Sequence, residues 1–243
     1  MPSPFCLRPS DLPEKSRPAS LPSWGMKQMA EQASGSALTR LDAFVDAAFA
    51  FAVTLLVIGG GAVPVDYAEL ERAVAKAPAF LIGFALIAMF WHAHVRWRGY
   101  GGRDGLLPVL LSLVIVFLVL VYVYPLRVMA TALVEFIGGD IRTIRSAREV
   151  GNLFTLYGLG FMAMALAIAA LFATSLKGPL SDEGRHGVQA EIGVWLIHAT
   201  AGGLSALLAR PAPVLAPWVY SLLPICIPAF IHFHQRRRRE TVA

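Results

Sequence analysis

The sequence predicts an all-α integral membrane protein with six membrane-spanning helices, and two observations support this fold class. First, 56% of the 243 residues are hydrophobic and only 15% are charged, whereas about 25% charged residues are usual in soluble domains. Second, the apolar residues gather in runs long enough to cross a bilayer, which takes about 20 residues in a helix. We place the six spans at 38–59, 71–97, 105–127, 148–175, 188–209 and 213–234.

The segments between these spans have the composition of connections. They are rich in Gly, Pro or charged residues, which interrupt apolar helices and favour turns. The connection between the last two spans is the shortest of the five, so it is the least clear division between two spans. The connections are GGGAVPVD (59–66), RGYGGRDG (98–105), FIGGDIRTIRSARE (136–149), KGPLSDEGRHG (177–187) and RPAP (210–213).

The chain divides into three regions around these spans. Residues 1–37 are rich in Pro, Ser and Lys and lack the apolar core of a signal peptide, so we expect a disordered cytosolic leader. Residues 38–234 form the transmembrane domain, and residues 235–243 form a polybasic cytosolic tail. With the N-terminus inside, 14 of the 21 Lys and Arg residues lie on the inner side and 7 on the outer side. Both termini are therefore expected to be cytoplasmic.

The net charge of +5 does not indicate nucleic-acid binding, because much of the positive charge flanks the spans. The run of arginines near the C-terminus directly follows an apolar helix, which favours contact with anionic lipid headgroups. The two cysteines, Cys6 and Cys226, form neither a metal-binding spacing nor a disulfide framework. The predicted lipid-contacting residues are Arg236, Arg237, Arg238 and Arg239.

The first span carries a stripe of residues at 3-4-3-4 spacing, which lies along one face of a helix. The stripe allows two interpretations: a packing seam between helices, or the lining of a pore with apolar constrictions and one hydroxyl layer. Asp46 belongs to a different stripe. No later segment repeats this pattern, so a pathway lined by this helix requires several chains around an axis. The stripe consists of Phe44, Ala47, Phe51, Thr54 and Ile58.

Charged residues at the start of this span pose a second question, because charge within a membrane is costly and usually paired. The second span ends at the same predicted side with FWHAH (90–94). We therefore expect a network of Arg40, Asp46 and either His92 or His94. Either Trp91 or Trp97 shields this network from lipid or donates an indole hydrogen bond to it. Asp42, at the interface, is left to solvent.

The sequence favours neither a metal site nor an enzyme. His92 and His94 lie two residues apart, so on a helix their rings diverge by about 200°, and no further cysteine or carboxylate cluster completes a zinc site. No Ser-His-Asp spacing, phosphate loop or catalytic carboxylate pair occurs. Glu191 and His198 share one face of the fifth span. Each is either a packing or snorkelling residue or a titrating group.

Several short motifs resemble one known family in the same order. Arg40, Phe44, Val45 and Asp46, followed by Thr-Leu-Leu at 54–56, resemble the Arg-x-x-x-Phe-Ser-Asp signature of the lysosomal potassium channel family, transmembrane protein 175, in its bacterial branch. The elements FWHAH (90–94), YPLRV (124–128) and TLYGLG (155–160) agree with this resemblance. The family's motif has Ser where this chain has Val45, and usually Leu or Ile where it has Phe51.

The resemblance implies six helices per chain and a homotetramer whose first helices line a central pore. It also implies cation conduction that prefers potassium, without a cofactor, in the bacterial inner membrane. Carried over by position, Phe51 is a hydrophobic constriction, Thr54 a hydroxyl layer and Ile58 a further apolar ring. Arg40, Phe44 and Asp46, with Trp91 and a histidine of the second span, brace the helices.

The leading prediction is thus a potassium-preferring channel, and two alternatives remain. One is a proton-coupled secondary transporter that uses Glu191, His198 and the histidines of the second span as titrating groups. Transporters often contain internal repeats, and none is evident in this sequence. The other is a non-conducting membrane scaffold or sensor with the same fold, which the departures at Val45 and Phe51 allow.

Overall fold

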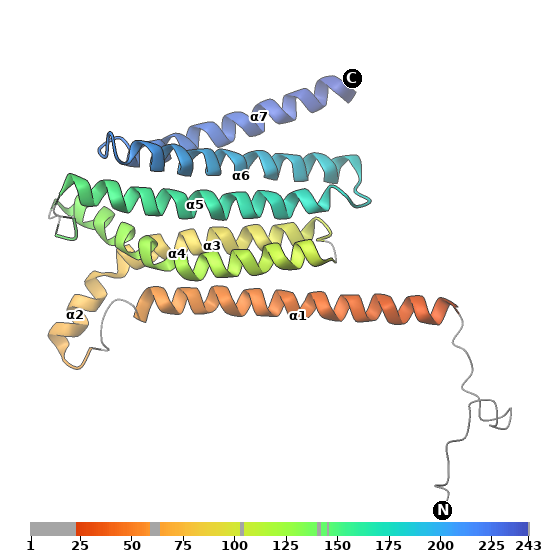
Figure 1. The fold of residues 1–243 in the computed structure, drawn as a ribbon, viewed down its shortest axis with the longest axis horizontal. Coiled ribbons are helices and arrows are strands. Elements are labelled where there is room, and N and C mark those ends of the chain that lie inside the picture. Colours follow the sequence, from red (N-terminus) through yellow and green to blue (C-terminus); the bar gives the residue numbers. More distant parts are fainter. Residues whose placement is uncertain (1–22, 59–63, 103–104, 140–141, 145, 243) are drawn as a thin grey trace, which may run out of the picture. The chain divides into compact units, whose positions relative to one another are not determined.

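The computed structural model describes residues 23–58, 64–102, 105–139, 142–144 and 146–242, with side chains between residues 40 and 236. The chain divides into two units, Met1–Arg40 and Leu41–Ala243. In the first unit the described backbone is helical from Ser23 onward, as the start of helix α1 (Ser23–Ile58). The second unit holds the rest of α1 and all the later helices (Figure 1).

The start of α1 differs from the prediction for the leader. Residues 23–37, which we expected to be disordered, are helical, and residues 1–22 lie outside the described residues. The part of α1 that is apolar enough to span a membrane nevertheless begins at Arg40, close to the predicted start at residue 38. Residues such as Met, Lys, Gln, Glu and Ala between 26 and 33 favour a helix without favouring a membrane.

The predicted second span, 71–97, is two helices in the structure. The short α2 (Tyr67–Ala75) begins where Asp66 caps it, since the Asp66 carboxylate accepts a hydrogen bond from the Glu69 amide at 2.7 Å. The longer α3 (Ala77–Gly99) carries a proline in its first turn, where a missing N–H costs little. The membrane-spanning helix therefore starts at Ala77 and not at residue 71.

The third predicted span, 105–127, is longer in the structure. Helix α4 (Leu106–Gly138) continues through Pro125 and ends at Gly139, which has a positive φ of 75°. Glycine tolerates this left-handed conformation at a helix end. Helix α5 (Ala147–Ser175) and helix α6 (Asp182–Leu208) follow, close to the predicted spans 148–175 and 188–209.

Among the described residues, five helical segments are long and apolar enough to cross a membrane, and the protein is therefore a membrane protein. The segment predicted as a sixth span, 213–234, consists of the 3₁₀ helix η3 (Pro217–Leu222) followed by α7 (Leu223–Val242). Helix α7 also continues through the predicted tail. The five spanning segments are Arg40–Ile58, Ala77–Gly99, Leu106–Gly138, Ala147–Ser175 and Asp182–Leu208.

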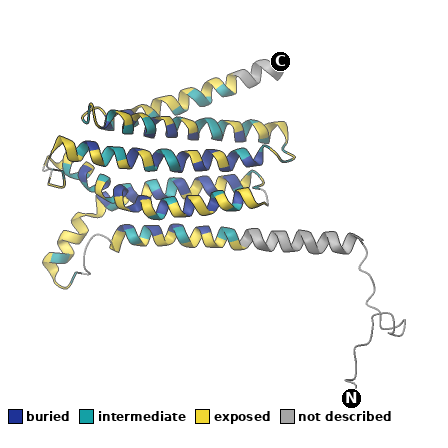
Figure 2. Ribbon diagram, in the orientation of Figure 1, coloured by how far each residue is buried: buried dark blue, intermediate teal, exposed yellow. Residues whose placement is uncertain are grey.

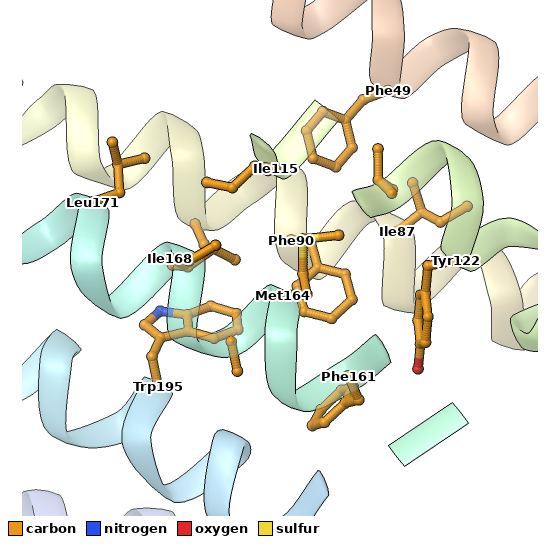
Figure 3. Packing of buried hydrophobic residues seen from close by; sticks show 14 of the residues in the cluster. Phe49, Ile87, Phe90, Ile115, Tyr122, Phe161, Met164, Ile168, Leu171 and Trp195 are labelled. Atoms are coloured by element: carbon orange, nitrogen blue, oxygen red, sulfur yellow. The ribbon is translucent and has the colours of Figure 1, made fainter. Parts of the chain in front are cut away.

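Helices α3 to α7 of the second unit pack in chain order, and α5 lies between α4 and α6 (Figure 1). Helix α5 is buried along most of its length (Figure 2). Large aromatic side chains fill the interior, where the Phe90 ring lies 5.7 Å from Phe161, 5.9 Å from Trp195 and 6.2 Å from Tyr122 between ring centroids (Figure 3). This cluster links α3, α4, α5 and α6 into one core, against which α1 can pack.

Candidate pore helix and its brace

Within the second unit, α1 has one buried and one exposed face. Its buried side chains recur every three or four residues, as expected for one face of a helix, and they join the hydrophobic core. Phe49 is one of them and points into the cluster (Figure 3). Their exposed fraction is at most 4%, and they are Val45, Phe49, Ala52 and Leu56.

The opposite face of α1 carries the stripe singled out in the sequence, and all five of its members are exposed in the single chain. Phe44 is 52% exposed, Phe51 is 55% exposed and Ile58 is 65% exposed. Large side chains with this exposure on a membrane helix must face lipid or another chain. The interior of this chain therefore does not use the stripe as a packing seam.

Thr54 adds one polar group to the exposed face. Its hydroxyl donates a hydrogen bond to the carbonyl oxygen of Ala50 at 3.0 Å. A threonine hydroxyl has one donor and two acceptor lone pairs. The proton is thus used within the helix, and the lone pairs of this exposed hydroxyl remain available as acceptors.

Helix α1 packs antiparallel on α3, as contacts at both ends show. The Trp91 indole donates a hydrogen bond to the Asp46 carboxylate at 2.8 Å. Toward the other end of α1, Leu56 lies so close to Gly83 that a Cβ on that glycine would come within 2.8 Å of the leucine side chain. Residue numbers thus rise along α1 while they fall along α3.

A second polar link lies one turn closer to the start of α1. The Arg98 guanidinium donates to the Asp42 carboxylate at 3.0 Å and to the Gly102 carbonyl at 3.0 Å. The sequence analysis left Asp42 to solvent and did not predict Arg98 as its partner. The antiparallel register was the signal that was missed: if Trp91 meets Asp46, then about one turn further Asp42 must meet the end of α3.

The two histidines of α3 have different surroundings. His94 is buried, with 2% exposure, and its Nε2 lies 3.1 Å from the Ser112 hydroxyl of α4. His92 is exposed. Within the described part of the chain, no group of three His, Cys, Asp or Glu side chains is arranged to hold a metal ion. Arg40 is exposed and is the last residue of the N-terminal unit, so its part in the brace stays a prediction.

The two residues considered as titrating groups lie on α6, away from the α1 stripe. Glu191 is 8% exposed and forms an ion pair with Arg96 of α3. A buried carboxylate with such a partner is held as a structural link between α3 and α6. His198 also has 8% exposure; its Nδ1 lies 2.8 Å from the Val194 carbonyl, and its ring stacks on Trp195 at 5.0 Å. Both contacts are those of a packed side chain.

Comparisons with known proteins agree on one family. Residues 40–125 match the profile of the family described as Endosomal/lysosomal potassium channel TMEM175. A protein from Marivirga tractuosa named "Potassium channel" is 33% identical over 153 residues, which are 59% of this chain and 61% of that protein. The chain thus matches less than two thirds of this relative's length.

Two crystal structures have a similar fold. A variant of the potassium channel MtTMEM175, solved with a Nanobody-MBP fusion protein, superposes with a TM-score of 0.71 at 26% identity, over 82% of this chain and 93% of that one. A homologue of the lysosomal potassium-selective channel TMEM175 from Chamaesiphon minutus superposes with a TM-score of 0.57 at 21% identity. That match covers 82% of this chain and 98% of the other.

The family match begins at Arg40, the first residue of the signature, and covers the α1 stripe, the Trp91–Asp46 contact and the histidines of α3. Both the family and the Marivirga tractuosa relative are described as potassium channels. Motif order, the profile match over residues 40–125 and the fold are all similar to those of the TMEM175 family.

Proposed function

We propose that the protein is a potassium-preferring cation channel of the bacterial inner membrane. In this proposal four copies of the chain surround an axis, α1 of each copy lines the central pore, and potassium is the permeant ion. The observation that carries the proposal is the exposed stripe of α1, whose bulky members are each more than half exposed in the single chain. The similarity to proteins named as potassium channels supports the choice of ion.

The stripe has the chemistry that a narrow cation pathway requires. Rings of Phe51 and Ile58 form apolar constrictions, which can close a pore by excluding water. Between them, Thr54 offers acceptor lone pairs to a partly dehydrated ion. The Phe51 ring faces can also attract a cation, since the face of an aromatic ring carries negative charge. The sequence contains no Thr-Val-Gly-Tyr-Gly filter, so selectivity must come from side chains.

The same proposal assigns the polar residues to bracing. Asp46 with Trp91, and Asp42 with Arg98, hold α1 against α3 at the cytoplasmic end, so that the stripe keeps its orientation toward the axis. Both termini are cytoplasmic in this topology, which requires the segment of η3 and α7 to return the chain across the membrane. The arginines at 236–239 then contact inner-leaflet headgroups.

Flux and cross-linking together test the proposal. Purified protein in liposomes should carry potassium down its gradient and carry sodium more slowly. In a background with Cys6 and Cys226 replaced by Ser, Thr54→Cys should form disulfide-linked dimers, whereas Leu113→Cys, on the exposed face of α4, should not. Absence of flux under every ionic and pH condition would refute conduction.

The alternatives give different results in the same experiments. Flux that saturates with ion concentration and requires a proton gradient would indicate a secondary transporter. A protein that cross-links through Leu113→Cys but not through Thr54→Cys, and carries no ions, would be a scaffold whose first helices lie away from the axis.

A further inference from the structure

A pocket with two arginines lies at the end of the bundle where α5 begins and α6 ends. Its volume is about 440 Å³, and Arg148, Gly151 and Asn152 of α5 line one side of it. Arg210 and Pro213, from the turn after α6, line the other side. It is far along the chain from the α1 stripe and shares no residue with it.

The close approach of the two helices explains why the pocket forms. A Cβ on Gly151 would lie 2.5 Å from the carbonyl oxygen of Ala209, so only glycine lets the backbones meet here. This contact places the first turns of α5 beside the residues that follow α6. Arg148 and Arg210 therefore belong to different elements but line the same pocket.

The residues that line the pocket include two arginines and no acidic side chain, while Glu149 lies beside Arg148 in the first turn of α5. Neither Arg148 nor Arg210 forms an ion pair with any residue whose side chain the structure describes. The N-terminus of α5 adds the positive end of a helix dipole, and backbone amides at such an end favour phosphate groups. Guanidinium groups bind phosphate oxygens in a bidentate manner, and the Asn152 side chain offers a further donor.

The surroundings of the pocket are apolar and exposed. Leu207, three residues before Arg210, is 75% exposed, and Val214, directly after Pro213, is 73% exposed. Trp218 of η3 is 63% exposed, and tryptophan is enriched where membrane meets water. A phosphate bound between the arginines would thus lie next to a surface suited to acyl chains, which distinguishes a lipid from a free anion.

We propose that this pocket binds the phosphate of an anionic phospholipid headgroup. The proposal also gives a role to arginines on the outer side of the membrane, where Lys and Arg are less frequent than on the cytoplasmic side. In the predicted topology both arginines face the outer side, which carries only 7 of the 21 Lys and Arg residues. The proposal does not depend on ion conduction, since this helix bundle would present the pocket to lipid in a membrane whether or not the protein conducts ions.

Native mass spectrometry of the purified full-length protein tests the proposal. The protein is mixed with equal amounts of phosphatidylglycerol and phosphatidylcholine, and the bound lipids are counted. The double variant Arg148→Gln and Arg210→Gln should lose most of its preference for phosphatidylglycerol, with roughly thirty-fold weaker binding for the two charges. Arg72→Gln, which removes an exposed arginine of α2, is the matched control and should bind like the unaltered protein.

Asn152→Leu provides a second test that leaves the net charge unchanged. Because Asn152 is exposed, the variant should fold, and it should also bind less phosphatidylglycerol. Unchanged lipid preference in the double variant, or an equal loss in Arg72→Gln, would overturn the proposal. Displacement of the lipid by millimolar inorganic phosphate would assign the pocket to a free anion and overturn the lipid assignment.

Discussion

Gly158 of α5 and Gly202 of α6 face each other so closely that neither has room for a side chain. A Cβ on Gly158 would lie 2.6 Å from the carbonyl oxygen of Gly202, and a Cβ on Gly202 would lie 2.8 Å from the carbonyl oxygen of Gly158. Small residues at such contacts let membrane helices pack through backbone atoms. At this reciprocal pair α5 and α6 pack backbone against backbone.

Replacing Gly158 by Ala should destabilise the bundle. The added methyl group meets backbone, which cannot move aside as a flexible side chain does, and overpacking of this kind costs about 1–3 kcal/mol. Thermal unfolding of the detergent-solubilised protein measures the effect. Gly138→Ala is the matched control, because a Cβ there meets nothing within 4 Å. Equal stability of Gly158→Ala and the unaltered protein would show that α5 and α6 can move apart at this contact without any loss of thermal stability.

Phe51→Ala should widen the proposed apolar constriction. Four lost rings leave a wider, more easily hydrated passage, so potassium leak should rise or selectivity over sodium should fall. Bilayer recordings or liposome flux with each ion measure both quantities. Leu113→Ala, on the exposed face of α4, serves as the control and should leave flux unchanged. An unaltered current in Phe51→Ala would remove this residue from the gate.

Thr54→Val should reduce potassium selectivity while it preserves the shape of α1. Valine has the same branching as threonine but lacks the acceptor lone pairs of the Thr54 hydroxyl. Thr54→Ser keeps the hydroxyl and should retain most of the selectivity. Reversal potentials in mixed potassium and sodium solutions compare the variants. Identical reversal potentials for all three proteins would exclude the hydroxyl from ion selection.

Trp91→Phe should weaken the attachment of α1 to α3. The phenyl ring replaces most of the indole surface but cannot donate to the Asp46 carboxylate. A hydrogen bond to a charged group contributes about 1.5–3 kcal/mol, and partial exposure of Trp91 reduces this value. Trp218→Phe, at a more exposed position, should have a smaller effect on the unfolding temperature. The reverse order of the two variants would contradict the brace.

Asp42 and Arg98 should be energetically coupled. Their side chains are 32% and 24% exposed, so solvent screens the pair in part, and we expect a coupling energy of about 0.5–1 kcal/mol. A double-mutant cycle with Asp42→Asn and Arg98→Gln measures it in unfolding experiments. Glu71 and Arg72 are adjacent on α2, where neighbours do not face each other, and their cycle should give no coupling. Additive effects at Asp42 and Arg98 would refute the link.

The sequence by itself predicted an all-α membrane protein, the resemblance to the TMEM175 family and the residues of the exposed α1 stripe. Apolar run length and turn composition depend only on local chemistry. Both ends of α5 and the C-terminal end of α6 were therefore predicted to within one residue, whereas α6 begins six residues before its predicted start at 188. The limits of α1, α3 and α4 were less accurate. Capping by Asp66, the proline at the start of α3 and the helix beyond Pro125 depend on how neighbouring residues satisfy backbone groups.

Only the tertiary structure decided which polar residues meet. The sequence placed Asp46 near the aromatic and histidine end of the second span, but the partner of each side chain depends on the register between helices. That register is set by packing contacts such as Leu56 against Gly83, and it brings Arg98 to Asp42. In the same way, the backbone contact of Gly151 with α6 places Arg148 and Arg210 around one pocket. Contacts between residues distant in sequence arise from packing, which no local pattern specifies.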